Sequence, residues 1–131
     1  MDNQHVDRLR PTLSEWERGN FAAGADVLSP DVVLTSFVAD GFVVSRGWEE
    51  IGKHLRDVFG QWGDYRIEVE QLTSLDDSSV LMEGRQYGFG KRSGIRIEDS
   101  LHIVFRFTGD RVTEMYWHPR REEVLGAAGV R

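Results

Sequence analysis

The sequence contains no cysteine. This absence excludes disulfide bonds, thiolate nucleophiles and zinc sites that need cysteine ligands, and it leaves the redox compartment open. Positive charge is also scarce, because 22 acidic residues outnumber 16 lysine and arginine residues and give a formal charge of −6. The basic residues are scattered along the chain, so neither nucleic acid nor an anionic membrane surface is expected as a partner.

Long apolar runs are missing as well. The opening residues, MDNQHVDRLR, carry acidic and basic side chains and are not followed by an apolar stretch. We therefore expect neither a secretory signal nor a membrane span, and we expect a cytoplasmic protein. A length of 131 residues suits one domain, so residues 1–131 are treated as a single domain.

Helical spacing of apolar side chains marks the first half of the chain. Val6, Leu9, Leu13 and Trp16 predict a first helix, in which Pro11 should cause a bend or mark the start. The other elements expected in this half are a short helix over 21–28, strands over 32–37 and 42–45 with a turn at 39–41, and a long helix over 48–62.

From residue 65 onward, apolar residues alternate with polar ones, as is typical of strands. The expected strands cover 66–72, 80–90, 95–107 and 112–118, and a terminal helix covers 121–128. No strand–helix repeat is present to build a parallel sheet. The pattern therefore predicts an α+β domain, in which a curved, antiparallel-rich sheet packs one face on N-terminal helices.

Asp99 interrupts an otherwise apolar strand face. Ile97, Leu101 and Ile103 share its side of the strand, so its carboxylate should point where they point. A charge among apolar groups needs a partner or takes up a proton. Asp99 is therefore expected either to form a structural ion pair, with Arg120 as its cross-strand neighbour, or to carry a proton in a pocket.

Two hairpins set the register around this residue. If Gly90 faces Ile95 and Phe107 faces Val112, parity decides which side chains share the Asp99 face. These are Gly84, Gln86, Gly88, Val112, Glu114, Tyr116 and His118. An odd-length loop or a bulge at either hairpin would exchange faces and bring other side chains into the pocket, namely Glu83, Arg85 and His102.

Under the first register, Asp99, His118 and Tyr116 are the candidate catalytic residues. His118 lies diagonal to Asp99, at roughly 7–8 Å along the backbone, within reach of an imidazole and a carboxylate. Gly84 and Gly88 would leave empty volume over the same face for a ligand. Structural roles remain open for all three candidates: an ion pair for Asp99, a hydrogen-bonded strand end for His118 and a packed aromatic for Tyr116.

A set of further residues is expected to line the pocket and bind the ligand. They are Trp16, His54, Phe59, Gln86, Leu101 and Glu114. The tryptophan and phenylalanine would be needed for folding with or without a ligand, and His54 can equally be a core residue. The four histidines show no ligand spacing, so no metal site and no cofactor are expected.

The opposite sheet face mixes aromatic and charged side chains, which suits a homodimer contact. Its expected members are Glu83, Arg85, Tyr87, Phe89, Glu98, His102, Met115 and Trp117.

Several segments resemble SnoaL-like domains of the nuclear transport factor 2-like superfamily. They are the runs at 88–95, 105–112 and 121–130, and earlier Trp16-Glu-Arg-Gly-Asn20, Leu28-Ser-Pro-Asp-Val-Val33 and Ser45-Arg-Gly-Trp-Glu-Glu-Ile51. Their order and spacing cover nearly the whole chain. The resemblance implies a cone-shaped sheet wrapped around helices, an apolar pocket, and commonly a dimer through the outer sheet surface.

The same resemblance leaves the activity open, because the superfamily includes ketosteroid isomerases, polyketide cyclases, epoxide hydrolases and dehydratases. Many relatives end the last strand with a tyrosine followed two positions later by an aspartate, where this chain has His118 and Arg120. The first strand offers Thr35 and Ser36 and no carboxylate, so steroid isomerisation is not assigned.

Two functions follow from these observations. In the first, the domain binds a small apolar molecule in its pocket. In the alternative, it is a cofactor-independent acid–base enzyme of the isomerase, cyclase or epoxide-hydrolase type, acting on a small apolar carbonyl or polyketide-like substrate. Asp99 would then move a proton, His118 would tune it and Tyr116 would donate to a developing oxyanion.

Overall fold

The computed structural model describes residues 4–38 and 41–129, and at 37–38, 41–42 and 58–59 it describes the backbone only. The elements are α1 (Gln4–Glu17), β1 (Leu28–Val38), β2 (Gly41–Arg46), α2 (Gly47–Phe59), β3 (Trp62–Ser74), β4 (Ser79–Gly90), β5 (Arg96–Thr108), β6 (Arg111–His118) and α3 (Arg121–Ala128).

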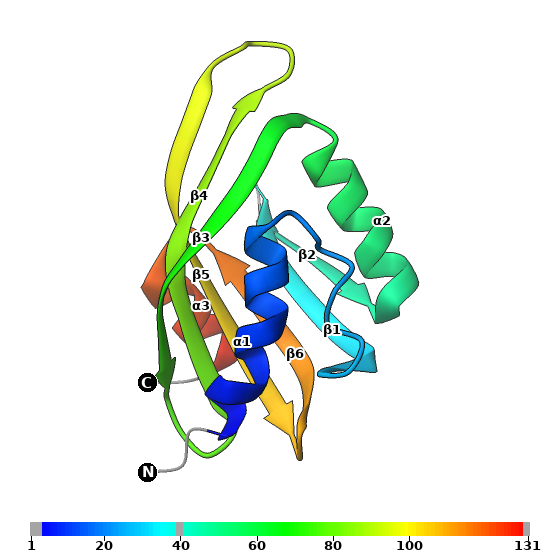
Figure 1. The fold of residues 1–131 in the computed structure, drawn as a ribbon, viewed down its shortest axis with the longest axis vertical. Coiled ribbons are helices and arrows are strands. Elements are labelled where there is room, and N and C mark those ends of the chain that lie inside the picture. Colours follow the sequence, from blue (N-terminus) through cyan, green and yellow to red (C-terminus); the bar gives the residue numbers. More distant parts are fainter. Residues whose placement is uncertain (1–3, 39–40, 130–131) are drawn as a thin grey trace.

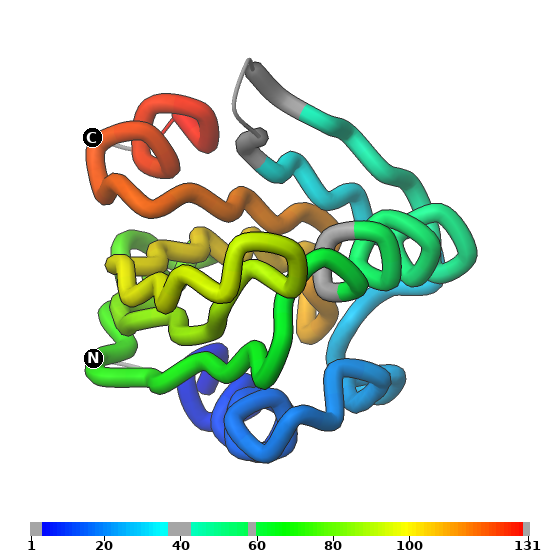
Figure 2. The backbone as a smooth tube through the Cα atoms, turned by 90° about the horizontal axis from the view of Figure 1, so that it is seen from above, coloured from blue at the N-terminus to red at the C-terminus, as the bar shows by residue number. Residues whose placement is uncertain are grey.

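The strands form one curved sheet in the order β2-β1-β6-β5-β4-β3. Every neighbouring pair is antiparallel except β1 and β6, which run parallel. Helices α1 and α2 lie toward the hollow side of the sheet (Figure 1), and the view from above places α1 and α3 on opposite sides of it (Figure 2). The predicted α+β architecture with an antiparallel-rich sheet is confirmed.

The expected helix over 21–28 is wrong, because this segment forms turns and leads into β1 at Leu28. Gly24 adopts a φ of 123°, which is outside the helical region and breaks any regular helix there. The expected long helix also ends earlier, since Trp62 belongs to β3. The turn expected at 39–41 falls mostly on residues 39–40, which lie outside the described part of the chain.

The main core lies between α1 and the hollow face of the sheet. Leu9 and Phe105 are fully buried, and Trp16 packs with its ring centroid 6.1 Å from that of Phe105 and 6.1 Å from that of Trp117. Pro11 lies inside α1. Aromatic rings in these tilted arrangements bury large apolar areas and stabilise the contact between helix and sheet.

A bulge in β6 changes which side chains face the core. The pair Phe107 and Val112 forms as predicted, but the next pair is Arg106 with Glu114, which leaves Thr113 as an extra residue on β6. The Thr113 hydroxyl lies 3.0 Å from that of Thr108. Because strand side chains alternate, one inserted residue moves everything after it to the opposite face.

The faces predicted for the second half of β6 are therefore wrong. Met115 and Trp117, expected on the outer face, are buried against the core. Glu114 and Tyr116, expected inside, face the other way, with Tyr116 opposite Val104. His118 pairs with His102 at the end of the strand, where it still reaches the cavity. The first hairpin has the predicted register, with Gln86 directly opposite Asp99.

Helix α3 covers part of the outer face. Val124 and Ala128 pack on Leu81 and Val104, with Tyr116 at the edge of this second apolar cluster. The guanidinium of Arg106 donates to the carbonyl of Ala128 and also contacts Glu114. Among the residues expected there, Arg85 and Glu98 form an ion pair of 2.7 Å on this face. The homodimer contact stays a prediction.

The two glycines expected to leave space for a ligand do not do so. A Cβ on Gly84 would lie 2.0 Å from the backbone oxygen of Glu68, and one on Gly88 would lie 2.8 Å from the Trp62 ring. The missing side chains thus allow β3 to approach β4 closely, beside a register shift between Val69 and Gln71.

We predict that Gly84→Ala lowers the free energy of unfolding by at least about 2 kcal/mol, because a backbone oxygen blocks the added methyl group. Gly126→Ala is the matched control. Its Cβ meets nothing within 4 Å, and it lies inside α3, so it should stabilise the protein by about 0.5–1 kcal/mol. Urea unfolding of the two variants measures both effects, and equal midpoints for Gly84→Ala and wild type would contradict the close approach.

Candidate functional site

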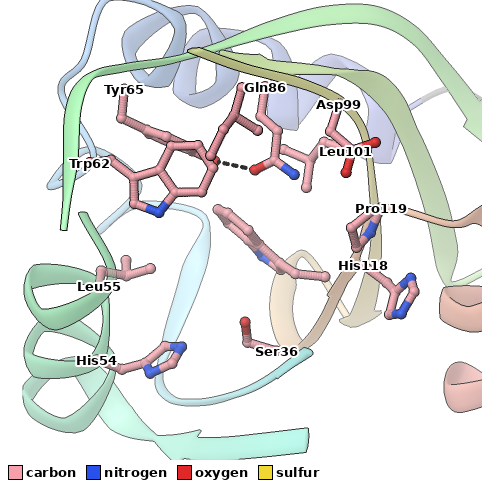
Figure 3. A pocket seen from close by; sticks show the side chains of 12 residues that line it. Ser36, His54, Leu55, Trp62, Tyr65, Gln86, Asp99, Leu101, His118 and Pro119 are labelled. Carbon is pink, nitrogen blue, oxygen red and sulfur yellow. Dashed lines mark hydrogen bonds between the residues drawn. The ribbon is translucent and has the colours of Figure 1, made fainter. Parts of the chain in front are cut away.

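A cavity of about 260 Å³ opens between α2 and the hollow face of the sheet (Figure 3). Its lining residues come from β1, α2, β3, β4, β5, β6 and the turn after β6. They are Ser36, His54, Leu55, Trp62, Tyr65, Gln86, Ile97, Asp99, Leu101, Trp117, His118 and Pro119. The volume lies just below the usual range for drug-sized ligands, so the site suits a small molecule.

The wall formed by β3 and β4 carries a hydrogen-bonded pair. The Tyr65 hydroxyl donates to Gln86 Oε1 at 2.9 Å, as the dashed line in Figure 3 shows. Burial raises the pKa of Tyr65, so its hydroxyl stays protonated through the physiological range. The bond fixes the orientation of the Gln86 amide, whose Nε2 lies 3.5 Å from the Ser100 carbonyl.

Asp99 lines the cavity on the face predicted for it, but it is exposed and stands at the rim. Its Oδ1 accepts a hydrogen bond of 2.8 Å from the backbone N–H of Ser100. The expected ion pair with Arg120 is not formed, because the bulge shifts the register and Arg120 pairs with Glu122 at 3.1 Å. The interpretation of Asp99 as a buried charge is therefore wrong.

His118 reaches the lining from the end of β6, although its ring points away from Leu55 and Trp62 in Figure 3. Its Nδ1 accepts a hydrogen bond of 2.8 Å from the backbone N–H of Arg120. Desolvation lowers the pKa of His118, against a smaller opposing effect of Glu123. The ring is therefore neutral at pH 7, with Nδ1 unprotonated.

Three predicted site residues, Tyr116, Glu114 and Trp16, do not line the cavity. The Tyr116 hydroxyl donates to Glu114 Oε1 at 3.1 Å on the outer face, and burial raises the pKa of Tyr116. The β6 bulge is the physical reason for the positions of Tyr116 and Glu114. Trp16 is a core residue that touches Trp117 and donates from Nε1 to the Ala23 carbonyl at 3.0 Å, without lining the cavity.

Of the remaining predicted residues, His54, Gln86 and Leu101 do line the cavity. The side chain of Phe59 lies outside the described part of the structure, so its place in the wall stays a prediction.

Seven lining residues were not among the predicted site residues, namely Ser36, Leu55, Trp62, Tyr65, Ile97, Trp117 and Pro119. Trp62 was assigned to the end of a helix and Tyr65 to the start of a strand. In the structure both lie on β3, and their rings make a T-shaped contact with centroids 5.5 Å apart. Trp117 was placed outside, yet the apolar spacing of Val112, Met115 and Trp117 already fits a strand with one extra residue.

The cavity carries few charges. No lysine or arginine is among the described residues that line it, and Asp99 supplies the carboxylate. Within residues 4–38 and 41–129, no group of three or more histidine, aspartate or glutamate side chains is placed to hold a metal ion. No helix in these ranges is long and apolar enough to cross a membrane.

Comparison with known proteins identifies relatives of this fold. The sequence profile of the SnoaL-like domain family matches residues 9–115. A search of curated protein sequences gave no match.

Solved structures are similar over nearly the whole chain. One is a protein of unknown function from Burkholderia pseudomallei, described as NTF2-like, with 17% identity, 96% of this chain and 97% of that chain covered, and a TM-score of 0.77. TerC, co-crystallised with polyporic acid, has 13% identity, 94% and 98% coverage and a TM-score of 0.76. A Jannaschia sp. CCS1 protein described as a SnoaL-like polyketide cyclase has 16% identity, 89% and 85% coverage and a TM-score of 0.70. At these identities the likeness shows the fold.

We predict that the His118 imidazole titrates below its ordinary pKa of 6.5. Between the folded and unfolded pKa values, the unfolded chain binds more protons, so this residue makes the protein less stable as the pH falls below 6.5. An NMR titration of the ring protons measures the midpoint directly. Replacing His118 with Gln should flatten the stability profile in that window, and a wild-type midpoint at or above 6.5 would contradict the partly desolvated, neutral ring.

Proposed function

The chain belongs to the family of SnoaL-like domains, and we propose that its cavity binds one small, largely apolar molecule. The observation that carries the proposal is the cavity lining: apolar side chains of Leu55, Trp62, Ile97 and Leu101 surround a few polar groups. Binding sites for small molecules have this composition, in which apolar surface provides affinity and isolated polar groups fix orientation.

One solved structure with the same fold supports a function in ligand binding. TerC, which shares the fold, was crystallised with polyporic acid, a small organic compound. Its sequence is 13% identical to this one, so the comparison supports a cavity that can hold an organic molecule and gives no ligand for this chain.

The alternative of a cofactor-independent acid–base enzyme has weaker support. It required a carboxylate with a raised pKa in an apolar pocket, together with Tyr116 as an oxyanion donor. Asp99 is instead exposed at the rim and accepts a backbone hydrogen bond, and Tyr116 faces the opposite side of the sheet. Binding needs neither of these groups, so it is the function that we propose.

We predict that wild-type protein binds the neutral bicyclic probe 1-indanone with a dissociation constant of about 1 mM or less, given its number of non-hydrogen atoms. Leu55→Trp should weaken binding by at least about tenfold, because the larger ring occupies cavity volume. Ligand-observed NMR measures the affinity, and thermal unfolding checks that the variant is folded.

The matched control is Ile95→Trp. Ile95 is 64% exposed and is not a lining residue, so its replacement should leave the affinity within about twofold of wild type. Equal binding to wild type and to folded Leu55→Trp would place the probe elsewhere, and no binding to wild type would overturn the proposal.

A further inference from the structure

We propose that Trp117, Ser36 and His54 form the polar end of the cavity. There the Trp117 indole N–H selects an uncharged molecule that carries a hydrogen-bond acceptor oxygen. This inference rests on the proposed function and names the class of ligand that the same cavity takes.

Unmet hydrogen-bonding capacity is concentrated at this end. Trp117 is 8% exposed, and its Nε1 is buried without a hydrogen-bond partner among the described residues. The Nε2 of His54 is also buried and has no hydrogen-bond partner among the described residues. Both residues line the cavity. Buried polar atoms are nearly always paired in folded proteins, so two orphans beside one cavity need a reason.

The other polar groups of the lining already have partners. The Tyr65 hydroxyl bonds to Gln86 at 2.9 Å, and the Asp99 carboxylate accepts from a backbone N–H at 2.8 Å. His118 Nδ1 accepts from the Arg120 N–H, also at 2.8 Å. A bound molecule therefore gains most from new hydrogen bonds at the end formed by Trp117 and His54.

The fold brings the three side chains of this end together. Ser36 on β1 is the register partner of Trp117 on β6, and side chains of paired residues in a sheet lie on the same face. His54 comes from α2, which packs on β1. In Figure 3, Ser36 and His54 lie at the end of the cavity opposite Tyr65 and Gln86.

The chemistry of the three groups limits the ligand. An indole N–H only donates, so its partner must be an acceptor such as a ketone, quinone, ester or ether oxygen. No lysine or arginine among the described lining residues could balance a carboxylate or phosphate. The Ser36 hydroxyl both donates and accepts, so a second polar group of either kind on the ligand finds a partner at this end.

The test compares three probes of one shape: 1-indanone, indane and indane-1-carboxylate. For wild type we expect 1-indanone to bind about fivefold tighter than indane, as one hydrogen bond allows, and tighter than the carboxylate. Trp117→Phe should reduce the affinity for 1-indanone to that for indane. Trp62→Phe, a matched loss of an indole from the apolar wall, should weaken 1-indanone and indane alike and keep their ratio.

Trp117 is a buried residue, so a second readout avoids reliance on a variant that can misfold. In wild-type protein labelled with ¹⁵N, 1-indanone should move the Trp117 indole N–H proton downfield, and indane should not.

Each other outcome overturns a specific statement. Equal affinities for 1-indanone and indane in wild type, with no downfield shift, overturn the inference and leave the proposed function standing. A preference that persists in folded Trp117→Phe removes Trp117 as the donor. Tighter binding of the carboxylate overturns the uncharged class, and no binding of any probe overturns the proposed function and this inference together.

Discussion

The alternation of side chains along β6, interrupted at Thr113, is the constraint on which the functional site of this structure depends. A strand sends successive side chains to opposite faces, so a single extra residue reverses every later assignment. Here the reversal sends Met115 and Trp117 into the core and turns Tyr116 outward. The place of Trp117 beside the cavity and of Tyr116 at the edge of the apolar cluster under α3 both follow from that insertion.

The extra residue Thr113 also determines which polar groups of β6 have hydrogen-bond partners. On the outer face, Glu114 of β6 forms an ion pair with Arg106 of β5 and accepts a hydrogen bond from Tyr116 of its own strand. On the inner face, the aromatic ring of Trp117 fills space beside the cavity and leaves its N–H without a described partner. A buried donor left unpaired is costly to the folded state, and a ligand that satisfies it is bound more tightly for that reason.

Much of the fold could be predicted from periodicity alone. The apolar spacing of Val6, Leu9 and Leu13 identified α1, and the turn between Gly90 and Ile95 gave the correct register for β4 and β5. The helix expected over 21–28 failed because helical spacing says nothing about the positive φ at Gly24.

The site was less predictable, because the face that each β6 side chain occupies depends on the strand register beyond the hairpin turn. Asp99 and Gln86 were placed on the correct face, yet the exposure of Asp99 depends on how far the long β4–β5 hairpin extends past the helices (Figure 1). Glu114 and Tyr116 were misplaced by one residue of register. Strand propensity cannot reveal a bulge, whereas the polar character of both residues against the apolar Met115 and Trp117 was consistent with one.

The most direct test of this account is the pairing of β5 with β6, measured as cross-strand backbone proton contacts by NMR. The account predicts that Trp117 pairs with Ile103 and Tyr116 with Val104. A regular hairpin without the extra residue would instead pair Trp117 with His102 and Tyr116 with Ile103. Observation of that second set would return Trp117 to the outer face and contradict the cavity described for this protein.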